Sequence, residues 1–156
     1  MTDASVHPVA EVRSETIGLG TRIWQFVVVL AGARIRRDCN IYSHCLSESD
    51  VMVGDRFRVN GGVQLCDGSR IVDDVFVGLN VAFGDDKCPI SGDKRFDRLN
   101  SWIDKGAVIC SDATVFPGVR IGNVATVGAG AVVTEDVPAR AAVVGTPAGA
   151  IKSARP

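Results

Sequence analysis

The chain has little of the composition that is typical of several large protein classes. Lys and Arg number 17 against 18 Asp and Glu, so the net charge of -1 leaves no positive excess for nucleic acid or a membrane surface. The apolar stretch VVVLAGA is too short to span a membrane and ends at Arg34, and the N-terminal segment has no apolar core of a signal peptide. We therefore expect a cytoplasmic protein without nucleic-acid or membrane partners.

Histidine and paired cysteines are also scarce. The 2 histidines are His7 and His44, and none of the 5 cysteines forms a CxxC pair. An odd cysteine count without such spacing fits a reducing compartment better than a disulfide scaffold, and it shows no pattern of zinc ligands, so we expect no metal. Cys66 lies at an outward position, where a reactive thiol is an open alternative.

What the sequence does contain is a six-residue repeat. Large apolar residues recur at every sixth position, with Ser47 as the one exception in the first run: Ile17, Ile23, Val29, Ile35, Ile41, Val53, Val59, Leu65, Ile71, Val77 and Phe83, then Ile103, Ile109, Val115, Ile121, Val127 and Val133. Small or branched residues precede the next aliphatic by two positions. Because strand side chains alternate between faces, each six-residue unit can direct two side chains inward.

Glycine directly follows the aliphatic residue in several of these units, at Gly18, Gly54, Gly78, Gly122 and Gly128. We expect these glycines to supply a positive φ in a tight turn.

This pattern resembles the hexapeptide repeat of left-handed parallel β-helices. The resemblance implies an all-β fold with three units per coil, so that residue i stacks on residue i+18, and about six to seven coils. Left-handed winding is an exception to the usual hand of parallel connections and comes from the resemblance alone. We expect one domain over residues 1–156, with a loop insertion at 84–102 and a C-terminal tail at 138–156.

The insertion is the first functional candidate. The repeat stops after Phe83 and resumes at Ile103, and the segment between them is rich in charge and contains two aromatics. An excursion adds nothing to the packing of a coil, and insertions of this kind usually carry a binding surface.

A closer resemblance rests on four stretches: HPVAEV (7–12), TRIWQFVVVLAGARI (21–35), DDVFVGLNVAFGDDKCP (73–89) and VTEDVPARAAVVGTPAGAIK (133–152). They are similar to N-acetyltransferases that act on nucleotide-linked (dTDP-type) 3-amino-6-deoxyhexoses. The resemblance implies transfer of an acetyl group from acetyl-CoA to the sugar amine by a homotrimer, with active sites between the subunits. It also implies a place in the synthesis of surface polysaccharide.

The resemblance also implies site residues. A carboxylate of the segment around Asp85 holds the amino sugar in similar enzymes, which assigns Asp86 to the sugar amine or hydroxyls and Asp85 to a supporting contact. The candidates for a general base are groups that accept a proton near neutral pH, His44, Asp67, Asp85 and Asp86, of which we take Asp86 and His44 as catalytic. The remaining substrate-binding candidates are Asp67, Asn80, Lys87 and Gln25, the last standing where similar proteins often have His.

The coenzyme is expected along the last coils. Small residues there would let a pantetheine arm lie close to the backbone, and the tail resembles the family segment near the adenine, with a basic residue for the phosphates. These candidates are Ala125, Gly130, Ala131, Thr146, Pro147 and Lys152.

Three other functions are alternatives to this acetyltransferase. An acyltransferase for another acceptor (another amino sugar, an antibiotic or an amino acid) shares nearly every feature above and stays open. A noncatalytic β-helix scaffold is disfavoured by the loop. A γ-class carbonic anhydrase needs three histidines around its metal, and this chain has 2.

Overall fold

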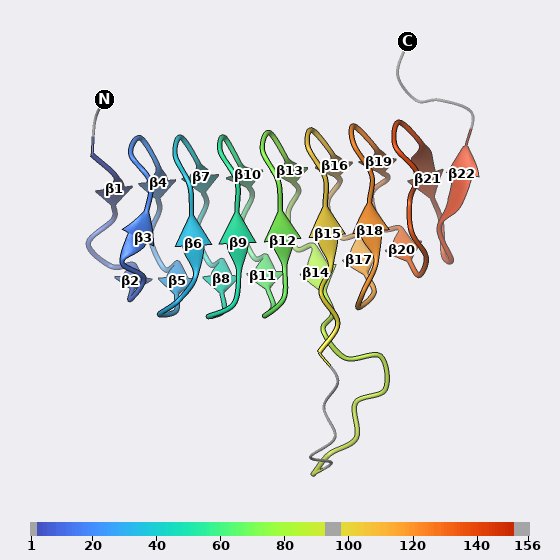
Figure 1. Cartoon of the computed structure of the whole chain (residues 1–156), viewed down its shortest axis with the longest axis horizontal. Coiled ribbons are helices and arrows are strands. Elements are labelled where there is room, and N and C mark those ends of the chain that lie inside the picture. Colours follow the sequence, from blue (N-terminus) through green and yellow to red (C-terminus); the bar gives the residue numbers. More distant parts are fainter. Residues whose placement is uncertain (1–2, 93–97, 152–156) are drawn as a thin grey trace.

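The chain winds into a stack of triangular coils whose three sides form three parallel sheets (Figure 1). The computed structural model describes residues 3–92 and 98–151, and this part of the chain contains strands and turns but no helix. Consequently it has no helix that could cross a membrane. The all-β prediction is confirmed, and the left-handed winding stays a prediction.

We name the sheets A, B and C. Sheet A consists of β1 (Ser5–Val6), β4 (Arg22–Ile23), β7 (Asn40–Ile41), β10 (Arg58–Val59), β13 (Phe76–Val77), β16 (Val108–Ile109), β19 (Thr126–Val127), β21 (Ala142–Val144) and β22 (Gly149–Ile151). Sheet B consists of β2 (Glu11–Val12), β5 (Val28–Val29), β8 (Leu46–Ser47), β11 (Gln64–Leu65), β14 (Ala82–Phe83), β17 (Thr114–Val115) and β20 (Val132–Val133). Sheet C consists of β3 (Thr16–Ile17), β6 (Arg34–Ile35), β9 (Met52–Val53), β12 (Arg70–Ile71), β15 (Trp102–Ile103) and β18 (Arg120–Ile121).

The register between coils is the one that the six-residue period predicts. Ile17 pairs with Ile35 and Ile35 with Val53 in sheet C, and the same offset of 18 residues holds in sheets A and B from β4 and β5 to the insertion. The first strands, β1 and β2, pair with β4 and β5 at an offset of 17 residues. Both inward positions of each unit from Thr21 to Val133 are buried, whereas Val12 and Ile17 of the first coil are half-buried. The core is therefore one continuous column of aliphatic and small side chains. Ser47 keeps its inward position and is 1% exposed.

The three corners of the coil carry the polar residues. Corner AB, between sheets A and B, comprises residues 24–27, 42–45, 60–63, 78–81, 110–113 and 128–131. Corner BC comprises residues 30–33, 48–51, 66–69, the insertion, and 116–119, and corner CA comprises 18–21, 36–39, 54–57, 72–75, 104–107 and 122–125.

The expectation for the glycines was wrong in its reason. Gly18 and Gly54 do not have positive φ; instead, a Cβ on Gly18 would lie 2.5 Å from the backbone of Arg36, and one on Gly54 would lie 2.6 Å from that of Val72. These glycines are required because the next coil approaches closely. Positive φ occurs two residues later, as at Gly20 and Asp38.

The insertion leaves the body after β14 and returns to β15, and Figure 1 shows its described first part, residues 84–92, extending away from the stack. At its base, the Leu99 N–H donates to the Asp85 carbonyl at 3.1 Å. Arg98 pairs with Asp50 at 3.3 Å and with Asp67 at 3.1 Å. The base of the loop is therefore tied to two earlier coils at corner BC.

The coil continues into the predicted tail. Val137 bridges to Ile121 and is 4% exposed, and β21 adds to sheet A before β22 folds back antiparallel to it.

Candidate functional site

The structure sorts the predicted substrate residues into two groups on opposite edges of sheet B. Gln25, His44 and Asn80 lie at corner AB, whereas Asp67 and the residues of the loop base lie at corner BC. No hydrogen bond or ion pair of the described residues joins the two groups. Within one chain they are therefore two half-sites.

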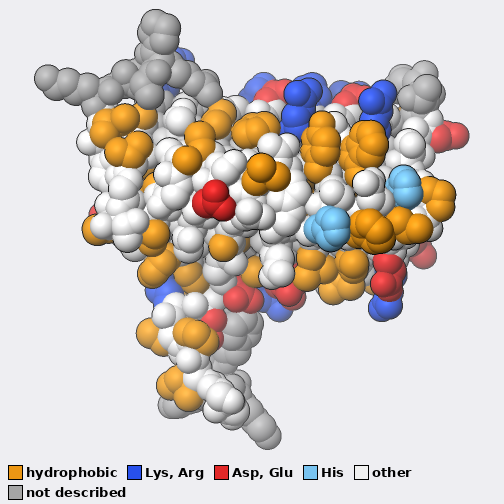
Figure 2. Space-filling view, turned by 180° about the vertical axis from the view of Figure 1, so that it is seen from behind, with side chains coloured by type: hydrophobic (Ala, Val, Ile, Leu, Met, Phe, Trp, Pro, Cys, Tyr) orange, Lys and Arg blue, Asp and Glu red, His pale blue; other side chains and the backbone are white. Residues whose placement is uncertain are grey.

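Corner AB is an exposed ridge with aromatic side chains at its N-terminal end. The His44 side chain is exposed at a positive φ of 62°, and its ring lies 5.1 Å from that of Phe26. Figure 2 shows the two histidines on one face, near exposed apolar side chains. Asn80 stands on the same column two coils on and donates through Nδ2 to Asp112 at 3.3 Å. The half-buried Gln25 precedes Phe26 on this ridge.

Trp24 and Tyr42 extend this ridge as a stacked pair. Their ring centroids are 5.9 Å apart and their planes differ by 6°, and the Trp24 indole donates to Asn40 at 2.7 Å. Both rings are partly exposed, 40% and 38%, so this edge of sheet B presents flat apolar surface.

The loop base at corner BC holds the predicted carboxylates. Asp86 is half-buried, and its Oδ1 accepts the Cys88 N–H at 2.9 Å, whereas its Oδ2 has no hydrogen-bond partner among residues 3–92 and 98–151. Lys87 is exposed. The Asp67 carboxylate is already engaged, because Oδ1 accepts the Asp50 N–H at 2.7 Å and Oδ2 pairs with Arg98.

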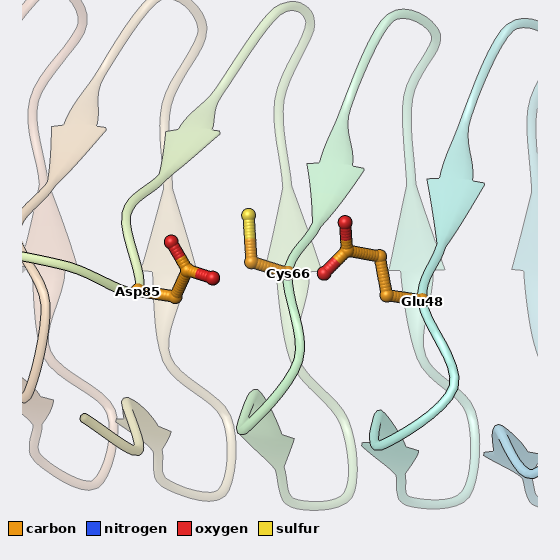
Figure 3. Close-up of side chains that lie close together, drawn as sticks. All are labelled: Glu48, Cys66 and Asp85. Atoms are coloured by element: carbon orange, nitrogen blue, oxygen red, sulfur yellow. The ribbon is translucent and has the colours of Figure 1, made fainter. Parts of the chain in front are cut away.

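Asp85 belongs to a cluster that our reading of the sequence missed. The carboxylate oxygens of Glu48 and Asp85 and the Cys66 sulfur lie within 4.8 Å of one another, and all three residues are half-buried. Figure 3 shows them in a row on successive coils, with Cys66 in the middle. The i+18 rule already places Cys66 over Glu48, so two of the three residues of the cluster could be placed from the sequence.

The surroundings of Cys66 raise the pKa of its thiol. Burial, and after it the charges of the neighbouring Glu48, Asp85 and Asp67 carboxylates, together raise the pKa of Cys66 to about 11. The thiol donates to the Phe83 carbonyl at 3.1 Å. At neutral pH Cys66 is therefore protonated and a poor nucleophile in the absence of a bound cation.

The coenzyme candidates lie on the last coils. Ala125 and Ala131 are fully buried, and their N–H groups donate to the carbonyls of Gly122 and Gly128. A coenzyme on the surface would therefore contact the neighbours of these two residues and not their side chains. Gly130 is exposed at corner AB, and a Cβ on it would have nothing within 4 Å.

The tail candidates lie beside the end of sheet B. Thr146 and Pro147 are exposed, and the flanking Gly145 carbonyl and Ala148 N–H bond to Val132 of β20 at 3.0 and 2.8 Å. Lys152 lies outside the described residues.

Comparison with known proteins finds that this coil is similar to proteins named acetyltransferases. No family model matches the chain. Putative acetyltransferase YJL218W of Saccharomyces cerevisiae is 30% identical over 121 residues, which are 70% of this chain and 59% of that protein. The 2,3,4,5-tetrahydropyridine-2,6-dicarboxylate N-acetyltransferase of Staphylococcus aureus is 52% identical over 52 residues, 33% of this chain and 22% of that protein. The chain thus spans less than two thirds of the length of these relatives.

Two solved structures share the coil. The hexapeptide-repeat acetyltransferase VCA0836 of Vibrio cholerae O1 biovar eltor, in complex with acetyl coenzyme A, is 26% identical with a TM-score of 0.65, over 76% of this chain and 69% of that one. A maltose O-acetyltransferase of Clostridium difficile 630 is also 26% identical, with a TM-score of 0.67, over 76% and 67%. The chain is therefore similar, in sequence and in its hexapeptide-repeat fold, to proteins named acetyltransferases.

Proposed function

We propose that the protein is an acetyl-CoA-dependent N-acetyltransferase that acts on the amino group of a nucleotide-linked (dTDP-type) 3-amino-6-deoxy sugar. The observation that carries the acyl donor is the likeness, in sequence and fold, to an acetyltransferase crystallised with acetyl coenzyme A. The sugar rests on the resemblance of residues 73–89, which end in the carboxylates at the loop base.

The chemistry needs few side chains. The neutral amine of the sugar attacks the thioester carbonyl, the new N–C bond forms, and the C–S bond breaks as coenzyme A leaves as a thiolate. The amine loses a proton to an acceptor in the site or to water, and donors held near the carbonyl oxygen stabilise the tetrahedral oxyanion. The protein's main contribution is to hold the amine and the thioester together.

Asp86 is the residue best placed to orient the amine. Its Oδ1 accepts the Cys88 N–H at 2.9 Å, which helps to orient the carboxylate, and Oδ2 would then accept a hydrogen bond from the sugar amine. Lys87 is exposed beside it and suits a phosphate of the nucleotide as a point charge. Asp67 is engaged with Arg98, so its role is to hold the loop base.

The assembly that suits the two half-sites is a homotrimer. Corner AB and corner BC flank sheet B within one chain, and a closed ring of three chains brings corner AB of one subunit against corner BC of the next. His44 and Asp86 would then face one site from two subunits. The last coils and the tail, with Gly130, Thr146 and Pro147, would line the coenzyme end of the same groove.

A hydroxyl acceptor is the second candidate. The likeness to a maltose O-acetyltransferase is as strong as that to the acetyl-CoA complex, at 26% identity and a TM-score of 0.67. Transfer to oxygen would use the same donor and the same groove.

The test is thiol release from acetyl-CoA against matched acceptors: nucleotide-linked 3-amino-6-deoxy sugars, their 3-hydroxy counterparts, and maltose. We expect turnover on a 3-amino sugar and a loss of about 10²–10⁴-fold in kcat in Asp86→Asn, because the amine is no longer oriented by a charged acceptor. Glu135→Gln, an exposed carboxylate on a late coil, is the control and should be unchanged. Faster turnover on a hydroxyl acceptor would transfer the proposal to the second candidate, and turnover unaffected by Asp86→Asn would remove the loop base from the site.

A further inference from the structure

The cluster at corner BC combines the donor types that a metal ion of intermediate softness prefers. It offers one sulfur, from Cys66, and two carboxylates, from Glu48 and Asp85. Sulfur ligands select against Mg²⁺ and Ca²⁺, whereas a thiolate together with carboxylate oxygens suits Zn²⁺.

The distances are close to those of a bound ion. With metal–ligand bonds of about 2.0–2.3 Å, neighbouring ligand atoms of a tetrahedral zinc site lie about 3.3–3.8 Å apart. The three ligand atoms here lie within 4.8 Å of one another. Side-chain rotations that move the ligand atoms by about 1 Å would therefore bring them to the separations of a zinc site.

The surroundings hold each ligand in place. The Asp67 N–H donates to Glu48 Oε2 at 2.7 Å, which orients that carboxylate. Asp67 is itself held by the Asp50 N–H and by Arg98. The Asp85 main chain is held by the Leu99 N–H at the base of the insertion. Such contacts around the ligands orient them and raise metal affinity.

The negative charge of the cluster also favours binding of a cation. Within residues 3–92 and 98–151, neither Glu48 nor Asp85 forms an ion pair, whereas the adjacent Asp50 and Asp67 are both paired with Arg98. Two carboxylates thus converge on a half-buried thiol without a described positive partner. A divalent ion would neutralise both.

We propose that Glu48, Cys66 and Asp85 form a binding site for a divalent cation of intermediate softness, with Zn²⁺ as the best match. On binding, the metal–sulfur bond forms as the thiol proton passes to solvent, and nothing is oxidised or reduced. The fourth position stays open to water or to a ligand. The ion would link three successive turns of the chain and clamp the insertion at Asp85. The site does not depend on the proposed acetyl transfer.

The test uses Co²⁺ as a spectroscopic probe on protein that has been freed of metal with a chelator. Wild type should bind one equivalent per chain with a thiolate-to-cobalt charge-transfer absorption in the near ultraviolet, and Zn²⁺ should displace it. Cys66→Ser should lose this absorption. Glu48→Gln and Asp85→Asn should each weaken Zn²⁺ binding by at least about 10–100-fold. Cys88→Ser, which removes an exposed thiol of the insertion, should bind as wild type.

Three results would overturn the site. They are a charge-transfer band that persists in Cys66→Ser, a band that disappears in Cys88→Ser, and wild-type Zn²⁺ affinity no higher than that of the Glu48→Gln and Asp85→Asn variants. Circular dichroism establishes that each variant is folded, and the two carboxylate variants carry the test if Cys66→Ser does not fold. Because the readout needs neither acetyl-CoA nor a sugar, its failure is distinct from failure of the proposed activity.

Discussion

Replacing Ser47 by Ala should stabilise the protein, because it removes a buried polar group from an otherwise aliphatic column. Ser47 interrupts the aliphatic column of sheet B, and its neighbours across the coils are Val29 and Leu65. Its Oγ is buried and has no hydrogen-bond partner among the described residues. The hydroxyl therefore gave up its bonds to water on folding without gaining others.

The magnitude follows from that burial. A buried hydroxyl without a partner costs about 1–3 kcal/mol, and Ala differs from Ser by that one atom, so the free energy of unfolding should rise by about the same amount. In a chain of this length each kcal/mol raises Tm by about 2–4 °C. Ser101, whose Oγ is also buried and unpaired among the described residues, should respond in the same direction.

Ser69 is the matched control, since it too points inward but its Oγ donates to the Cys66 carbonyl at 2.7 Å. Ser69→Ala should lower the free energy of unfolding by about 0.5–1.5 kcal/mol. The assay is urea and thermal unfolding at one protein concentration, because assembly shifts the apparent stability. If Ser47→Ala is no more stable than wild type, or if the three variants shift alike, the argument from unpaired hydroxyls is refuted.

Three further predictions concern packing, pH and assembly. Phe57→Ala should lower the free energy of unfolding by about 3–5 kcal/mol in urea titrations, because the ring is fully buried and large; a loss under about 1 kcal/mol would contradict this. The Arg56 guanidinium, through its hydrogen bonds, lowers the pKa of Asp74 below 3.8. This carboxylate therefore stabilises the fold above that pH, and the stabilisation is lost as the pH falls through the pKa of the folded state. Asp74→Asn should consequently lose less stability than wild type on acidification, and equal dependence of the free energy of unfolding on pH in the two proteins would refute this. Mixed trimers of His44→Ala and Asp86→Asn chains, each inactive alone, should regain about a quarter of wild-type activity, because half of each kind of corner is intact; no recovery would exclude a site shared between subunits.

Much of the fold could be predicted because the repeat is a direct consequence of strand geometry. Inward side chains must recur every six residues if three sides of a coil are to close around one core, so the period alone puts Ile17, Ile35 and Val53 in register, as the strand pairing has them. The same rule placed Ser47 inside. The candidate site was harder, because the period places an outward residue on its coil but does not say which side chains converge there, and it ends at the insertion.

The sequence by itself determined the coil, its register and the position of the insertion, since these depend on which residues are apolar and how far apart they stand. Only the tertiary structure decided how the loop base leaves the coil, and it put Asp86 at the edge of sheet B opposite to that of His44. It also decided that Asp85, 19 rather than 18 residues after Cys66, reaches the same cluster as Glu48. At the loop base the chain leaves the repeat, and the spacing of residues along it no longer sets their distance in space.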